Sequence, residues 1–240
     1  MTDEKIRKFE ISAFSLKIIA IIAMTFNHIA HAFMDVLPIY LLAPLYVAGG
    51  LTFPIMAYLM IEGYHKTSNI KKYMLRLLVF ALIAVFPFFL VFRVSVLNVL
   101  FTFLLGLICL FLHDRMKKKA LFWLCFAGIV AVTLFCDWPL LGVPMIIMFG
   151  LIKKPRLRIV LTTAIVSLAM IALVVLSGAG WGRQLFLDIG FNIAILATIP
   201  LLFAYGGKRG YSPRSLRYLF YIYYPAHLLV IGGIAWLIQR

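Results

Sequence analysis

Long runs of apolar residues, separated by short basic clusters, make up most of this 240-residue chain. Hydrophobic residues account for 65% of it and charged residues for only 13%, whereas soluble domains have about 45–50% and about 25%. A soluble fold with so little charge could not cover its own surface, so lipid must be the solvent over most of its area. We therefore expect an all-α, polytopic membrane helix bundle in which residues 1–240 form one integral membrane domain, with no soluble domain.

The number of membrane crossings follows from the lengths of the apolar runs. A helix needs about 20 apolar residues to span the hydrocarbon core, and this criterion predicts about nine transmembrane helices. The weakest segment, 139–152, is short and contains Pro139 and Pro144. The predicted spans are 14–33, 41–64, 73–92, 96–112, 120–135, 139–152, 157–176, 184–205 and 215–238.

The basic residues indicate how these spans are oriented. With nine crossings and a cytoplasmic N-terminus, 20 of the 23 Lys and Arg residues lie on the inner side, and only Arg93, Arg183 and Arg240 lie outside. Cytoplasmic loops of membrane proteins carry such an excess, so we expect a multi-pass protein of the cell (cytoplasmic/inner) membrane. Because the +15 net charge is confined to loops between spans, we expect membrane lipids as partners and no nucleic acid.

The first predicted span holds the densest set of polar groups, and ionisable groups inside a bilayer are candidates for function. Lys17 and His28 are eleven residues apart, or about 16 Å along a helix, which places the imidazole roughly half-way through the membrane. His28 is a candidate general base, and Asn27 could orient it or polarise a carbonyl. His31 lies on the same broad face. The alternative is that Asn27, His28 and His31 bond neighbouring helices or lie at the wet outer interface.

The last span offers a second imidazole within the segment YIYYPAHLL. Pro225 interrupts backbone hydrogen bonding there, and a broken helix beside Tyr223, Tyr224 and His227 favours a polar cavity. A proline kink with ordinary aromatic packing is the competing interpretation.

Two basic regions on the predicted inner side could hold a polyphosphate. The first contains Lys71, Lys72 and Arg76, and it follows Glu62, which could form an i to i+4 pair with Lys66. The second is the segment GGKRGYSPRS, in which glycines allow close backbone approach and Lys208 and Arg209 supply charge. Attraction of these clusters to anionic lipid is the simpler alternative.

The predicted outer side carries polar and charged side chains that a substrate entering from outside would need, although any outer loop has similar side chains. The predicted substrate-binding residues are Asn98, Asp137 and Trp138 on this side, together with His31 of the first span and Glu62 at the inner interface. We expect no metal, because the chain has no HExxH motif and its three cysteines show no metal-ligand spacing.

Six short segments follow one another along the chain: LKIIAIIAMTFNHIAHAF, FPIMAYLMIEGYHKTSNIKKYMLRLL, NVLFTFLLGL, CDWPLLGV, GKRG and YYPAHLL. In this order they resemble the TraX family, bacterial membrane proteins named for an enzyme that acetylates the N-terminus of conjugative pilin. That family is similar to a wider group of membrane acyltransferases, which share a basic residue, ten residues and then a histidine in the first span. Lys17 and His28 match this spacing, but members often have Asp before the histidine, where this chain has Asn27.

The resemblance implies a transmembrane acyltransferase fold and the transfer of an acetyl group from cytoplasmic acetyl-CoA, as co-substrate, to an amine or hydroxyl. The acceptor could be a peptide N-terminus such as that of a pilin, a sugar or a lipid. His28 would be the base, with Asn27, Tyr224 or His227 steadying the oxyanion and Lys17 at the channel mouth. The cofactor-binding candidates are Lys17, Lys71, Lys72, Arg76, Lys208 and Arg209. A small-molecule transporter and a non-catalytic partner of a pilus or secretion apparatus remain alternatives.

Overall fold

The structure is a computed structural model that describes residues 10–177, 182–211 and 213–238. Residues 1–9, on which the predicted cytoplasmic N-terminus depends, lie outside these ranges, as do Arg240 and the side chains of Arg214 and Arg217. Within the described part the chain is helical and contains no strand, only the isolated bridges Ile11–Tyr205 and Leu97–Cys136.

Among the described residues, helices overlap each of the predicted segments, and two of these segments contain two α-helices each. The elements are α1 (Ala13–Ala32), α2 (Ile39–Ala48), the 3-10 turn η1 (Gly49–Leu51), α3 (Thr52–Lys66), α4 (Ile70–Ile83), α5 (Val85–Phe92), α6 (Val99–Arg115), α7 (Lys119–Val132), the 3-10 turn η2 (Thr133–Phe135), α8 (Gly142–Leu151), α9 (Pro155–Leu176), α10 (Arg183–Phe203) and α11 (Arg214–Ile238).

Length separates clear membrane spans from shorter helices. In the described part, five helical stretches are long and apolar enough to cross a membrane: α1, α2 to α3, α9, α10 and α11. The pair α4 and α5, bent by 46°, would make a sixth. Pro87 in the first turn of α5 has no N–H to bond back to α4, which accounts for the bend.

The segment 139–152 forms a helix shorter than predicted. Its helix, α8, begins only at Gly142 and has ten residues, or about 15 Å, half of a hydrocarbon core of about 30 Å. The preceding residues form a tight loop in which Trp138 and Leu140 adopt positive φ values of 62° and 60°. α11 differs from prediction as well, because it runs through Pro225 as one 25-residue helix.

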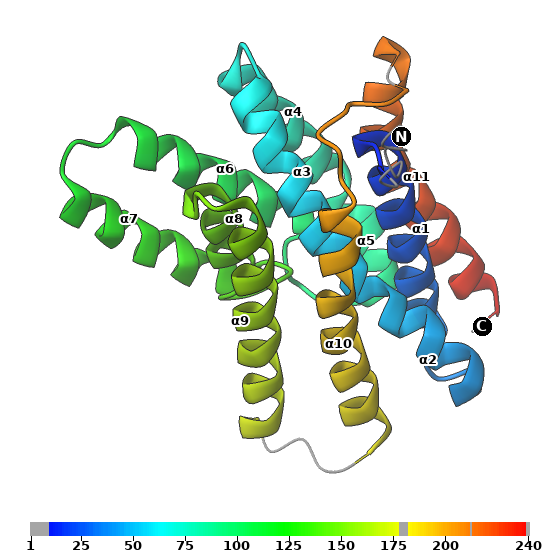
Figure 1. Cartoon of the computed structure of the whole chain (residues 1–240). Helices are drawn as coiled ribbons and strands as arrows, with labels where there is room; N and C mark the ends of the chain where they lie inside the picture. Colours follow the sequence, from blue (N-terminus) through cyan, green and yellow to red (C-terminus); the bar gives the residue numbers. More distant parts are fainter. Residues whose placement is uncertain (1–9, 178–181, 212, 239–240) are drawn as a thin grey trace, which may run out of the picture.

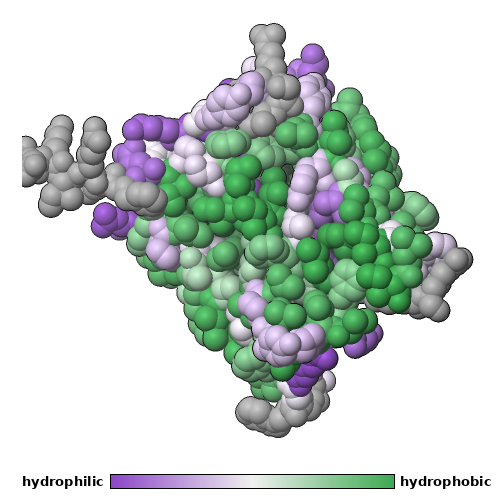
Figure 2. All heavy atoms as spheres, turned by 90° about the vertical axis from the view of Figure 1, so that its right-hand side faces the viewer, coloured by the Kyte–Doolittle hydropathy of each residue, from purple (hydrophilic) through white to green (hydrophobic). Residues whose placement is uncertain are grey.

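The long helices stand side by side with their ends at two poles of the molecule (Figure 1). The α3–α4 loop, the beginnings of α1 and α9 and the loop after α10 lie toward the upper pole, while α1 and α9 end, and α10 begins, toward the lower one. The surface between the poles is mainly apolar, and hydrophilic residues gather toward the top and bottom in the face shown in Figure 2. This distribution is typical of a protein that crosses a membrane several times.

Candidate active site

The first and last long helices are joined by two side-chain hydrogen bonds one helical turn apart. Thr25 of α1 lies 2.7 Å from the Tyr223 hydroxyl of α11, and His28 lies 2.7 Å from His227. Thr25 donates its own proton to the Ile21 carbonyl at 2.8 Å, so the Tyr223 hydroxyl is the donor to Thr25. The two candidate histidines, 199 residues apart in sequence, therefore lie in one seam.

The histidine pair is buried and geometrically well defined. His28 and His227 are 8% and 7% exposed. Nδ1 of His28 faces Nε2 of His227, with ring planes within 11° and ring centroids 4.9 Å apart. That centroid separation is nearly the largest that a 2.7 Å N···N distance permits, so the rings lie edge to edge in one plane. The bond is consequently a direct N–H···N hydrogen bond.

The second nitrogen of His227 fixes the tautomers of both rings. His227 Nδ1 lies 2.8 Å from the Tyr223 carbonyl oxygen, which can only accept, so Nδ1 carries the proton. Neutral His227 then presents its Nε2 lone pair, and His28 must donate from Nδ1. The remaining lone pair of His28 is therefore on Nε2, and this nitrogen is the one that can accept a proton from a substrate.

Aromatic side chains surround the pair. Phe92 of α5 meets the His28 ring edge-on at 5.2 Å, and Tyr224 approaches His28 and His227 at 6.2 and 5.7 Å between centroids. Tyr224 is 4% exposed, and its buried hydroxyl makes no hydrogen bond of standard geometry in the described part of the chain, although the Val99 N–H of α6 lies near it. Because an N–H can only donate, the hydroxyl proton has no acceptor among these contacts and is available to a ligand.

Asn27 does not orient His28, contrary to one predicted role. Its Nδ2 donates to the Tyr46 carbonyl of α2 at 3.0 Å, and its side chain packs where a Cβ on Gly49 would come within 2.4 Å. Successive helix residues are about 100° apart, so Asn27 faces α2 while His28 faces α11. Any part for Asn27 in stabilising an oxyanion stays a prediction.

His31 belongs to a second polar group between α1, α2 and α10. Its ring lies 4.9 Å from Tyr46 and 5.1 Å from Phe92. The Tyr46 hydroxyl donates to Asp188 at 2.8 Å, and Gln184 donates to the same carboxylate at 2.9 Å. Because Phe92 contacts both His28 and His31, this group adjoins the histidine pair.

The predicted substrate-binding residues of the outer loops have structural partners. Asn98 is fully buried; it donates to the Ala81 carbonyl and caps α6 by accepting from Leu100 N–H. Trp138 stacks on Phe53 at 4.1 Å. Asp137 accepts from Trp138 N–H at 3.0 Å, and burial raises the pKa of its carboxyl to about 6 while that hydrogen bond opposes the rise. A substrate contact by these three residues stays a prediction.

The predicted cofactor-binding residues come from three segments that lie toward the upper pole (Figure 1). The loop after α10 is tied to the start of α1 by Ala13 N–H bonding the Lys208 carbonyl at 2.9 Å and Phe14 N–H bonding the Arg209 carbonyl at 3.2 Å. Lys208 also forms a 2.6 Å ion pair with Glu10. Lys17 Nζ lies 5.3 Å from the Phe220 ring centroid.

The remaining cations of this set lie along the first turns of α4. Lys71 and Lys72 are exposed, and Arg76 lies over the Tyr73 ring at 5.6 Å with its Nε buried and without a partner in the described structure. Glu62 instead pairs with Lys66 at 2.8 Å, which confirms the i to i+4 pair. No group of three potential metal ligands occurs among the residues the structure describes.

Comparison with known proteins places this architecture in a family. The family model described as TraX protein matches residues 12–235, nearly the whole chain. The chain belongs to the TraX family. A curated relative, the "Probable fimbrial assembly protein FimC, serogroup H1" of Dichelobacter nodosus, is 32% identical over 249 residues, covering 94% of this chain and 96% of the relative. No solved structure matches the chain significantly.

Three residues around the site of this TraX family member were not predicted from sequence. Thr25 and Phe92 contact the histidine seam, and Tyr46 supplies both a carbonyl for Asn27 and a hydroxyl for Asp188. Thr25 lies three residues before His28, and this spacing of about one helical turn could have predicted that the two side chains share a helix face. Phe92 and Tyr46 were not recognisable, because apolar spans are full of aromatic residues.

Proposed function

We propose that this protein is a membrane-embedded acyltransferase that moves an acetyl group from cytoplasmic acetyl-CoA to an amine or hydroxyl acceptor. The observation that carries the proposal is the buried His28–His227 pair, whose hydrogen bonds leave a basic nitrogen on His28, with the ring of Tyr224 next to both imidazoles. Membership of the TraX family, whose name is associated with pilin acetylation, supports acetyl transfer.

In the proposed reaction, Nε2 of His28 takes the proton from the acceptor nitrogen or oxygen as that atom attacks the thioester carbonyl. The new N–C or O–C bond forms, the C–S bond breaks, and the proton passes from His28 to the departing thiolate of coenzyme A. His227 holds the imidazole of His28 in the required tautomer. Its Nε2 accepts a hydrogen bond from the His28 Nδ1–H, which becomes more acidic when His28 is protonated to the imidazolium. The Tyr224 hydroxyl would donate to the developing oxyanion. Direct transfer is proposed because the seam offers no cysteine or serine nucleophile among the contacts described.

The donor would approach from the basic pole. Acetyl-CoA is a polyanion that does not cross lipid, so its nucleotide would rest near Lys71, Lys72, Arg76, Lys208 and Arg209. The pantetheine arm would pass Lys17, about 16 Å along α1 from His28. This arrangement requires the basic pole to face the cytoplasm in the bacterial inner membrane.

The proposed topology is nine crossings with a cytoplasmic N-terminus, in which the short helix α8 passes through the protein interior. α8 supports this, because six of its ten residues are buried: Gly142, Val143, Met145, Ile146, Ile147 and Phe149. Cysteine labelling in intact cells tests it. A cysteine at Lys117 or Lys208 should resist a membrane-impermeant reagent, whereas one at Val36 should react; labelling at Lys208 would contradict the orientation.

The acceptor most consistent with the comparisons is a pilus or fimbrial protein. The Dichelobacter nodosus relative carries the name of a fimbrial assembly protein, and a pilin N-terminus would supply the amine. A sugar or lipid hydroxyl is the competing acceptor of the same reaction.

Calorimetry on the purified protein tests the donor. Acetyl-CoA is expected to bind wild type and His28→Ala alike, in the micromolar range, and to bind a Lys208→Ala, Arg209→Ala double variant more weakly. A Lys117→Ala, Lys118→Ala control that binds acetyl-CoA as tightly as wild type would show that the weaker binding is specific to the loss of Lys208 and Arg209. Absence of binding by wild type would remove the donor from the proposal and favour a transport function.

A further inference from the structure

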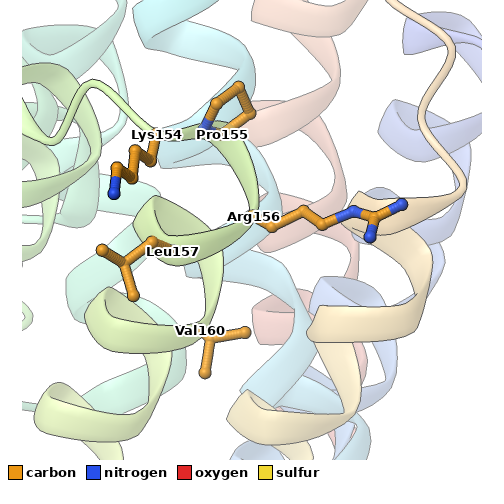
Figure 3. Close-up of a pocket in the computed structure, with 5 residues that line it drawn as sticks. All are labelled: Lys154, Pro155, Arg156, Leu157 and Val160. Atoms are coloured by element: carbon orange, nitrogen blue, oxygen red, sulfur yellow. The ribbon is translucent and has the colours of Figure 1, made fainter.

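A shallow cavity that is widely open lies at the beginning of α9, away from the histidine seam. It is lined by Lys154, Pro155, Arg156, Leu157 and Val160. Figure 3 shows Arg156 reaching toward α10 while Lys154 extends to the opposite side.

The lining of this cavity is almost entirely apolar, and unbalanced positive charge lies at its edges. Lys154 and Arg156 are exposed, and neither takes part in an ion pair within the part of the chain that is described. They flank Pro155, the first residue of α9, whose N-terminus adds the partial positive charge of a 22-residue helix. Because Lys154 and Arg156 extend to opposite sides (Figure 3), an anionic group between them would be attracted by both cations and by the helix end from a distance.

The apolar lining of the cavity continues onto the membrane surface of α9. Leu157 and Val160 are 44% and 38% exposed. Further along the same helix, Leu161, Ile165 and Leu168 are exposed as well. Since α9 is one of the clear membrane spans, a chain that leaves the cavity past Val160 would lie in the hydrocarbon region.

We propose that this cavity binds the phosphate head group of an anionic glycerophospholipid, with one acyl chain running along α9 from Leu157 and Val160. The combination of two unpaired cations with an adjoining lipid-exposed apolar strip fits an anionic lipid. A zwitterionic lipid brings its own ammonium group next to Lys154 and Arg156, which repel it. A nucleotide is a poorer fit, because none of the five lining residues is aromatic and could stack on a base. The proposal is independent of acyl transfer.

Native mass spectrometry of the full-length protein in detergent tests this site. Phosphatidylglycerol and phosphatidylcholine of identical acyl chains are titrated separately, and wild type is expected to retain the former about 10-fold more tightly. Lys154→Gln, Arg156→Gln should lower phosphatidylglycerol affinity about 10- to 30-fold, since each basic residue contributes about fivefold. The control Lys117→Gln, Lys118→Gln, which removes two exposed lysines outside the cavity, should leave it unchanged.

Two further arms distinguish a lipid from a free phosphate compound. Leu157→Gln retains both cations and should still weaken phosphatidylglycerol binding several-fold; no effect would mean that no acyl chain is bound there. Inorganic phosphate and coenzyme A, each in excess over the lipid, should not displace it from wild type. Displacement by either compound, or equal retention of the two lipids by wild type, would overturn the proposal.

Discussion

Nδ1 of His28 lies 2.7 Å from Nε2 of His227, and the two rings share a plane. The bond joins the first and last helices of the described structure, so the position of one imidazole depends on packing of the two ends of the chain. His227 is itself held by the Tyr223 carbonyl at 2.8 Å. A chain of two hydrogen bonds therefore determines which nitrogen of His28 is basic.

Removal of the partner histidine, His227, should make His28 a less effective base without abolishing catalysis. His227→Phe keeps an aromatic ring at this position but loses the nitrogen that accepts the hydrogen bond from His28. A hydrogen bond to a charged group contributes about 1.5–3 kcal/mol, so the kcat of acetyl transfer should fall about 10- to 100-fold. His227→Gln, whose carbonyl oxygen can still accept, should recover part of the loss. Steady-state kinetics of both variants would contradict this role if kcat were unchanged, or if only KM rose.

The Tyr224 hydroxyl is buried and makes no hydrogen bond of standard geometry among the described residues, so Tyr224→Phe should leave stability equal or slightly raised. If the hydroxyl donates to the oxyanion, transfer should fall by about 10²–10³. Thermal unfolding and turnover measured on the same preparation separate the two effects. A stable Tyr224→Phe protein with full activity would exclude Tyr224 from the reaction.

The 3-10 turn between α2 and α3 depends on small residues. A Cβ at Gly50 would lie 2.2 Å from the Phe191 carbonyl oxygen and 2.9 Å from Ala194. Gly50→Ala should therefore push η1 away from α10 and cost about 1–3 kcal/mol of unfolding free energy. The control is Gly128→Ala on α7, where a Cβ meets nothing within 4 Å. Thermal unfolding should show a lower Tm for Gly50→Ala alone; equal Tm values would contradict the packing.

Much of the fold was predictable because lipid imposes a simple rule: helices must be long and apolar. That rule located the helical segments of the described residues, including the boundaries of α9 and α10 within two residues. It failed before Gly142, where Trp138 and Leu140 adopt left-handed backbone conformations that no apolar-length criterion detects. It also could not reveal that the turn at Gly49 and Gly50 lets α1 and α10 approach α2 closely.

The candidate site was only partly predictable. His28 and His227 were recognisable because an ionisable group in a membrane span is costly and therefore indicates a function. Their pairing was not predictable, because it is a contact between helices at the two ends of the chain. Asn27 was assigned the wrong neighbour, since adjacency in sequence puts side chains on different faces of a helix. TraX membership, found along residues 12–235, is confirmed.

The ion pair between Glu10 and Lys208 gives a prediction about the donor. Both side chains are well exposed, so Glu10→Gln should change stability by less than about 1 kcal/mol. Because it releases Lys208 to a phosphate group, it should tighten acetyl-CoA binding, whereas Lys208→Ala should weaken it. Calorimetry on the two variants would contradict a cofactor role for Lys208 if both affinities moved in the same direction or neither moved.

The most direct measurement follows radiolabelled acetyl groups from acetyl-CoA into the protein, lipid and glycan fractions of membranes that contain wild type or His28→Gln at equal abundance. We predict that wild type labels one of these fractions and that His28→Gln lowers the initial rate by at least about 10²-fold, with acetyl-CoA affinity unchanged. Equal labelling by the two proteins would contradict the assignment of His28 as the base. Labelling of the enzyme itself, trapped in a single turnover, would contradict direct transfer.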